Sequence, residues 1–335
     1  MTDGFSSFKA MAIGVGIIFA GTAIAPHVAD GQFDMLKLNK GKRGKTSKGS
    51  TGSTTETTST LPGVSPETTT GSTTNSFYSE ETLIPSNFDI DTELVTAPLA
   101  SSAAPDHVGA FRFVCNAGQL LKDDPIVYPG QPGKSHLHQF YGNTGANAHS
   151  TYKSLRESGQ STCVSPLNRS SYWMPAMLDG KGNVVRPDYV TIYYKRRPAS
   201  DPKCTAGNTM AEGNCVPLPN GLKFVFGFDM VSGQAPTGAL YYNCDGPGAT
   251  QGRYLTIPDA IATCPAGSRI GALINAPSCW DGKNLDSPNH RDHVAYKSYG
   301  SWGYAKCPET HPYVIPSFMM GAWYSITPRD DLKLW

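Results

Sequence analysis

Charged residues are scarce in this sequence. Asp, Glu, Lys and Arg make up 16% of the 335 residues, against roughly 25% in typical soluble domains. Helical bundles need many charged residues on their exposed faces, so this scarcity, together with 35 Gly and 26 Pro, argues against a helical fold. The formal net charge is only +1, which gives no electrostatic reason to expect nucleic acid as a partner.

Several catalytic signatures are also missing. The sequence has no G-x-S-x-G elbow, no P-loop, no G-x-G-x-x-G and no H-E-x-x-H. These absences count against α/β-hydrolases, nucleotide-dependent enzymes and zincin proteases. No C-x-x-C is present, and no Cys/His spacing matches a zinc finger or ribbon.

The cysteines that are present lie together in the second part of the chain. All eight fall between Cys115 and Cys307. An even number of cysteines in a chain with an export signal predicts up to four disulfides formed in an oxidising compartment. The sequence alone allows on the order of 100 pairings. Cys204 with Cys215 is the pair we expect first, because a short turn-rich loop joins them.

The N-terminal segment is typical of an exported chain. Residues 10–25 form an apolar run preceded by Lys9; the run is shorter than the roughly 20 residues of a membrane span and fits a signal-peptide core. Ala23 and Ala25 form a small-residue cleavage pattern, but Pro26 disfavours cleavage directly before it. We therefore predict a signal peptide or an uncleaved signal anchor at residues 1–29, with membrane contact only through residues 10–25.

Residues 30–104 have the composition of a linker. A cluster of Lys and Arg at 37–48 is followed by a Ser/Thr-rich stretch at 46–76. Such a stretch has little apolar surface to bury and does not offset its conformational entropy. We predict a disordered stalk that leaves the next domain secreted, or tethered at the cell surface.

From residue 105 to 330 the sequence predicts one disulfide-rich β domain. Short β-branched or aromatic segments alternate with Gly/Pro/Asn clusters, and no segment keeps a 3.6-residue apolar period. The segments are 111–115, 189–195, 222–228, 238–244 and 270–275. We expect a mainly β fold, an antiparallel β-sandwich or jelly roll with long disulfide-stapled loops, and minor helix at 258–263.

Five blocks of this domain carry a resemblance to a known family. They are FRFVC at 111–115, DPIVYPGQPGKSHLHQFYGN at 124–143, SYWMPAML at 171–178, CWDGKNLDSPNHRDHVAY at 279–296 and CPETHPYVIPSF at 307–318. The sequence resembles a family of secreted fungal and bacterial domains of unknown function that often accompany WSC carbohydrate-binding modules. The resemblance implies an extracellular domain in a carbohydrate context and brings no established activity.

Two histidine pairs lie within these blocks. His136 and His138 are two residues apart, so an extended strand would point both to one face. His290 and His293 lie in an Asp-rich segment and could converge with them at a turn. Two to four of these histidines plus an Asp would suit zinc or copper, with an open coordination position for water or substrate.

Three interpretations of the histidines stay open: a metal site, metal-free acid/base chemistry, and loops ordered by hydrogen-bonded histidines. For the catalytic interpretations we expect Asp281 or Asp286 as ligand or general base, with His293 and Arg291 beside it. Aromatic side chains nearby would stack on sugar rings; the candidates are Tyr141, Trp280 and Tyr296.

The sequence therefore predicts an exported domain with a His/Asp pocket, acting as a hydrolase or lyase of extracellular or cell-surface polysaccharide. The alternative is a non-catalytic module for carbohydrate binding or adhesion, or a surface protein that binds metal.

Overall fold

The computed structural model describes residues 14–18, 109–198, 200–229, 232–234, 236, 238–300, 303–326 and 333–334. The predicted stalk at 30–104 and the rest of the predicted signal segment lie outside these residues. The chain divides into one compact unit, formed by residues 1–30 and 77–335, and a second unit of residues 31–76 that lies wholly outside the described residues.

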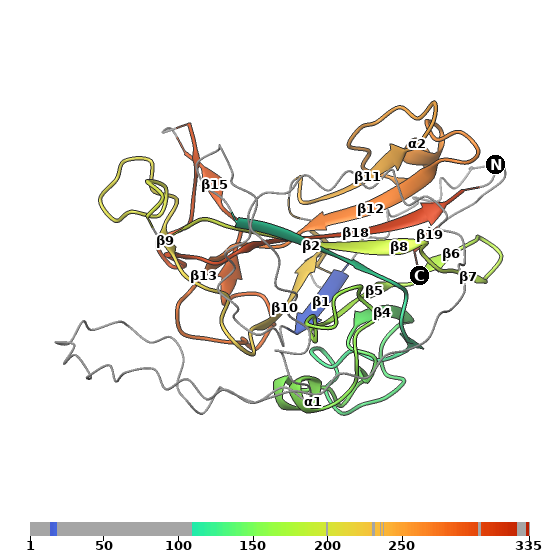
Figure 1. The fold of residues 1–335 in the computed structure, drawn as a ribbon, viewed down its shortest axis with the longest axis horizontal. Coiled ribbons are helices and arrows are strands. Elements are labelled where there is room, and N and C mark those ends of the chain that lie inside the picture. Colours follow the sequence, from blue (N-terminus) through green and yellow to red (C-terminus); the bar gives the residue numbers. More distant parts are fainter. Residues whose placement is uncertain are drawn as a thin grey trace, which may run out of the picture. The chain divides into compact units, whose positions relative to one another are not determined.

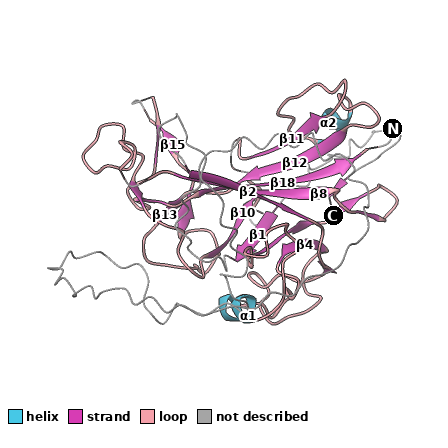
Figure 2. Cartoon of the chain, in the orientation of Figure 1, coloured by secondary structure: helices cyan, strands magenta, loops and turns pink. Residues whose placement is uncertain are grey.

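The described part is mainly β, as the sequence predicts, and most of it is antiparallel (Figures 1 and 2). The first large sheet has the strand order β10 (Lys223–Gly227), β1 (Gly14–Ile18), β5 (Ser171–Pro175), β4 (His138–Gly142) and β3 (Leu120–Leu121). The second has the order β11 (Leu240–Asp245), β12 (Arg269–Asn275), β18 (Ser317–Ser325), β8 (Tyr189–Arg196) and β2 (Gly109–Cys115).

Smaller elements complete the described part of the fold. A four-stranded sheet has the order β14 (Val294–Ala295), β13 (Cys279–Trp280), β17 (Tyr313–Val314) and β9 (Asn214–Cys215), with β9 parallel to β17. β15 (Ser298–Tyr299) pairs with β16 (Ala305–Lys306), and β6 (Met177–Leu178) lies between β19 (Lys333–Leu334) and β7 (Val184–Val185). The helices are α1 (Tyr152–Glu157), which the sequence analysis did not anticipate, and α2 (Ile257–Ile261), close to the predicted position.

The two large sheets face each other across an aromatic core. Tyr172 of β5 stacks on Phe318 of β18 with ring centroids 5.6 Å apart, and Phe226 of β10 meets Phe318 edge-on at 5.9 Å. The hydroxyl groups of Tyr172 and Tyr194 share a hydrogen bond of 2.7 Å between the sheets. This face-to-face packing is consistent with the expected sandwich.

A second core covers the other face of the first sheet. Side chains alternate along a strand, so Tyr141 and Tyr172 point to the first core while Phe140 and Trp173 point to the second. The second core contains Ile18, Ile126, Phe140, Ala146, Leu155 and Trp173. Because β4 and β5 are buried on both faces, their sequences show no polar/apolar alternation.

Four disulfides join all eight cysteines: Cys115–Cys163, Cys204–Cys215, Cys244–Cys264 and Cys279–Cys307. The predicted pairing of Cys204 with Cys215 is confirmed. This density of disulfides is typical of extracellular proteins. Within the described residues, no helix is both long and apolar enough to cross a membrane.

Candidate functional site

The structure does not bring the two histidine pairs together. His138 lies on β4, whereas the Nε2 atom of His293 bonds the carbonyl of Lys223 on β10. In the sheet order, β4 and β10 are three strand positions apart, about 14 Å at the usual strand spacing. Among the described residues, no three His, Cys, Asp or Glu side chains are grouped as metal ligands. The two histidine pairs therefore do not come together as the expected ligands of one zinc or copper ion.

The first pair, His136 and His138, lies at the start of β4. His138 is 3% exposed, and its Nδ1 donates to the carbonyl of Asp123 at 2.8 Å, with the Ser135 hydroxyl 3.4 Å away. The exposed His136 ring is beside it, with the ring centroids 4.3 Å apart. His138 therefore anchors the preceding loop to the sheet through Nδ1.

The carboxylates near this pair are engaged in holding the same loop. Asp124 accepts the indole N–H of Trp173 at 3.2 Å and the backbone N–H groups of Ile126 and Val127 at 2.9 Å each. Asp123 next to it accepts two further backbone N–H groups. These contacts give both carboxylates a structural role, because their lone pairs already serve as acceptors.

The second pair lies in the Asp-rich segment, where Ser287 organises a tight loop. Its hydroxyl accepts from the backbone N–H groups of Arg291 and Asp292 and lies 2.9 Å from Nδ1 of His293. His293 is 1% exposed. Since its Nε2 donates to Lys223, both of its ring nitrogens are occupied. His293 has no nitrogen left for a metal or for proton transfer in this arrangement.

His290 differs from its neighbour because it is partly exposed. Its Nδ1 bonds the carboxylate of Asp286 at 2.8 Å, and the other oxygen of Asp286 pairs with Lys223 at 3.1 Å. Partial burial raises the pKa of Asp286, but the contacts with His290 and Lys223 outweigh that effect and hold the pKa below its ordinary value. His290 has a φ of 59°, the one positive value at a non-glycine residue in the described part of the chain. Such backbone strain is common at functional sites.

The other predicted catalytic residues have structural contacts. Arg291 donates to the carbonyls of Gly227 and Phe228. Asp281 accepts the backbone N–H groups of Lys283 and Asn284; burial raises the pKa of Asp281, but these bonds outweigh it and lower the pKa overall. Asp281 thus closes a turn, and only the Asp286–His290 pair keeps the form of a catalytic dyad.

The predicted sugar-stacking residues are also built into the fold. Tyr141 is 0% exposed and Trp280 is 2% exposed, so neither offers a ring face to a ligand. Tyr296 is half-buried and donates its hydroxyl proton to the carbonyl of Asn275 at 2.9 Å. The structure thus corrects the expected aromatic platform for Tyr141 and Trp280, which are packing residues, and it ties the hydroxyl of Tyr296 to the backbone.

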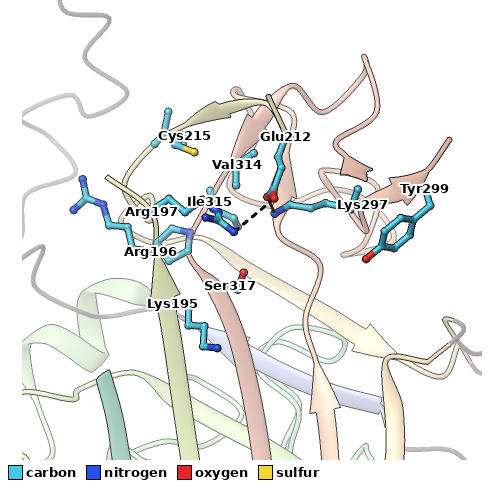
Figure 3. Close-up of a pocket in the computed structure, with 13 residues that line it drawn as sticks. Lys195, Arg196, Arg197, Glu212, Cys215, Lys297, Tyr299, Val314, Ile315 and Ser317 are labelled. Carbon is cyan, nitrogen blue, oxygen red and sulfur yellow. Dashed lines mark hydrogen bonds and ion pairs between the residues drawn. The ribbon is translucent and has the colours of Figure 1, made fainter. Parts of the chain in front are cut away.

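A cleft of about 450 Å³ opens elsewhere, between the end of β8, the start of β18 and the small sheet that contains β9 and β17 (Figure 3). Four cationic side chains and one carboxylate line it, an excess of three positive charges. They are Lys195, Arg196, Arg197, Lys297 and Glu212. The disulfides Cys204–Cys215 and Cys279–Cys307 brace the β9 and β13 strands of the small sheet.

Glu212 organises the cations on one side of the cleft. Its side chain is 9% exposed and pairs with Lys297 at 2.5 Å, Lys203 at 3.3 Å and Arg197 at 3.7 Å. Burial raises the pKa of Glu212, but the hydrogen bond and charge of Lys297 and the other two cations outweigh it, so the pKa is lowered. Glu212 is therefore held ionised, and it neutralises part of the charge around it.

Other groups of the cleft stay available to a ligand. Lys195 is exposed and lies 5.2 Å from the ring centroid of Tyr193, and Arg196 is partly exposed. Tyr299 is 78% exposed. Figure 3 shows Lys195, Arg196 and Tyr299 around the cleft whose upper wall carries the Glu212–Lys297 pair.

Sequence reasoning missed this cleft. The run Lys195-Arg196-Arg197 at the end of a predicted strand was a usable signal. No sequence signal pointed to Glu212, Lys297 or Tyr299. These residues come near residues 195–197 only because the small sheet and its disulfides place them there.

A family model described as "Domain of unknown function (DUF1996)" matches residues 124–333. The chain belongs to this family. The match spans both histidine pairs and all the lining residues of the cleft, so these features are part of the DUF1996 domain. No curated protein and no solved structure matches the chain.

Proposed function

We propose that this domain binds an acidic polysaccharide outside the cell, in the basic cleft. The observation that carries the proposal is the excess of three positive charges in a cleft whose rim carries an exposed tyrosine. Uronate or sulfate groups on a sugar chain would pair with Lys195 and Arg196, and the guanidinium group could hold a carboxylate with two parallel hydrogen bonds. The four disulfides favour an extracellular location for this binding.

The exposed Tyr299 ring supplies the apolar half of such a site. Aromatic rings present a flat apolar face together with a polar hydroxyl, a combination that suits the apolar face and hydroxyl groups of a sugar ring. The cleft is moderate in size for a ligand pocket, which suits a few sugar units of a longer chain.

Binding to polygalacturonate tests the proposal, with the fully methyl-esterified polymer as the matched neutral ligand. We expect the full chain to bind the acid form by isothermal titration calorimetry, and to bind it less tightly as salt is added, because salt screens surface charge. The esterified form should bind at least about tenfold more weakly, a difference of about 1.4 kcal/mol. Equal binding of the two forms, or binding to neither, would overturn the proposal.

Substitutions locate the site. The double variant Lys195→Ala/Arg196→Ala should bind polygalacturonate about tenfold more weakly, and Tyr299→Ala should weaken binding without changing its salt dependence. Lys134→Ala/Lys283→Ala removes two positive charges from exposed positions outside the cleft and is the matched control. If the control loses as much affinity as the cleft variant, the attraction is a property of the whole surface and not of the cleft.

A second candidate is cleavage of such a polymer by the Asp286–His290 pair. The pair has the oriented carboxylate and partly exposed imidazole that acid/base chemistry uses, and His290 has a strained backbone. His290→Gln should then abolish release of unsaturated or reducing ends from polygalacturonate while leaving binding intact. Full cleavage by the variant, or no cleavage by the unmodified protein, counts against this candidate.

A further inference from the structure

The strand β1 lies inside the predicted signal segment, yet it is paired on both edges. Residues 14–18 run antiparallel to β10, from Gly14 opposite Gly227 to Ile18 opposite Lys223. Residues 16–18 run antiparallel to β5. Figure 1 shows this blue strand between β10 and β5. The apolar N-terminal segment therefore supplies an internal strand of the first large sheet.

Without β1 the sheet would contain an open slot. β5 and β10 both run antiparallel to β1 and do not pair with each other. They stand two strand positions apart, about 10 Å, too far for direct hydrogen bonds. Their facing N–H and C=O groups would lose partners in a region where Tyr172, Trp173, Phe224 and Phe226 are each at most 1% exposed. Unpaired backbone groups in such surroundings are costly.

The side chains of β1 fit this slot. A Cβ atom added to Gly16 would lie 2.2 Å from the indole ring of Trp173, so the strand approaches the ring in a way only glycine allows. Two residues later on the same face, Ile18 is 1% exposed and belongs to the second core with Trp173 and Phe140. The small Gly16 leaves room for the indole ring of Trp173, and the large Ile18 fills space in the second core. The side chains of β1 therefore match the side chains against which they pack.

We infer that residues 14–18 stay in the folded protein as its own internal strand, inserted between β5 and β10. Cleavage at the Ala23/Ala25 pattern would remove this strand, so the folded protein retains its N-terminal segment. Residues 19–108 join β1 to β2 along the chain, so insertion of this strand pairs segments that are far apart in the sequence.

Hydrogen exchange on the full chain tests this inference directly. The backbone amides of residues 14–18 should exchange at least about a hundredfold more slowly than those of a free peptide of residues 10–25. The intact mass of the exported protein should include residues 1–25. Exchange at the free-peptide rate, or a cooperatively folding protein that begins at Pro26, would overturn the inference.

A pair of glycine substitutions tests whether residues 14–18 are a strand of the folded domain or serve only as an export segment. Gly16→Val should lower the midpoint of thermal unfolding by at least about 5 °C, because the added side chain meets Trp173. Gly109→Val makes the same change on β2, where an added Cβ would lie 3.8 Å from its nearest neighbour, and should leave the midpoint nearly unchanged. Equal effects of the two substitutions would count against the inference. If Gly16→Val does not fold, the exchange measurement on the unmodified chain decides alone.

Molar mass by light scattering shows whose strand fills the slot. A monomer with slow exchange at residues 14–18 supports insertion of the chain's own segment. A dimer whose protection at residues 14–18 is lost when it dissociates on dilution would mean that two copies exchange their strands, which overturns the intramolecular assignment.

Discussion

The imidazole rings of His136 and His138 lie side by side, with centroids 4.3 Å apart. Burial, and then the neighbouring His136, lower the pKa of His138 to about 4, against smaller opposing contributions from Asp124 and Asp123. Burial also lowers the pKa of His136. At neutral pH the pair is therefore uncharged in the folded protein, and acid is expected to disrupt this part of the fold.

The direction of the pH effect follows from the lowered pKa. An unfolded histidine titrates near 6.5, so between about pH 6.5 and 4 the unfolded chain binds more protons than the folded one. The contribution of His138 to stability is complete above about pH 6.5 and is lost as the pH falls toward 4. The size is on the order of 3 kcal/mol. Urea unfolding at a series of pH values measures it.

His138→Asn is the variant that isolates this effect. The asparagine amide can keep the hydrogen bond to the carbonyl of Asp123 that Nδ1 of His138 makes, but it does not titrate. We expect a flatter dependence of unfolding free energy on pH between 6.5 and 4. An unchanged slope in His138→Asn would assign the acid sensitivity to other groups.

Glu212→Gln should destabilise the fold and strengthen ligand binding at the same time. The substitution leaves Arg197, Lys203 and Lys297 without their shared carboxylate, and we expect a loss of roughly 1–3 kcal/mol in the free energy of unfolding. Lys297, which lines the cleft and would be released from this carboxylate, should raise the affinity for polygalacturonate. Denaturant unfolding and calorimetry measure the two effects.

The salt dependence of Glu212→Gln provides a check on its cause. Repulsion among the three cations should weaken at high ionic strength, so the stability gap to the unmodified protein should narrow. Glu212→Gln/Lys297→Met, which removes one of the three cations, should recover part of the lost stability. A gap that does not respond to salt or to the second substitution would point to lost packing.

Opening the Cys204–Cys215 disulfide should loosen the cleft without unfolding the two large sheets. The bond closes a loop of sequence separation 11, and the double variant Cys204→Ser/Cys215→Ser should lose about 2 kcal/mol. Affinity for polygalacturonate should fall because β9 borders the cleft. Cys244→Ser/Cys264→Ser opens a disulfide whose residues do not line the cleft and is the matched comparison. Equal losses of affinity would argue against the cleft as the binding site.

Ser287→Ala should show that His293 is a structural residue. The Ser287 hydroxyl bonds the His293 ring and two backbone N–H groups. Removing it from a partly buried loop should cost roughly 1–3 kcal/mol of stability. His293→Ala should destabilise the fold at least as much, since that ring also holds Lys223 on β10. Thermal unfolding tests both; unchanged stability in His293→Ala would reopen a role for this histidine in chemistry.

Local sequence patterns were sufficient for part of the fold. The segments at 111–115, 189–195 and 270–275 became strands because β-branched and aromatic residues favour extended backbone wherever they pack. The pairing of Cys204 with Cys215 was also predictable, because a short loop limits the choice of partner. In contrast, β4 and β5 were not predicted as strands, since both of their faces are buried and their sequences lack alternation.

The histidine and aromatic candidates failed to converge for a related reason. Sequence proximity showed that His136 lies near His138 and that His290 lies near Asp286. It did not show that two other strands separate β4 from β10. Nor did it show which aromatic ring is exposed: Trp280 is buried and Tyr299 is open to solvent.

The sequence by itself determined the mainly β character of the domain and its content of disulfide-forming cysteines, because strand propensity and cysteine number are local properties. Only the tertiary structure decided the order of the strands, the insertion of residues 14–18 between β10 and β5, and the meeting of Lys195, Glu212 and Lys297 in one cleft. These relationships depend on contacts between residues far apart in the chain, and such contacts are set by packing and backbone pairing across the whole domain.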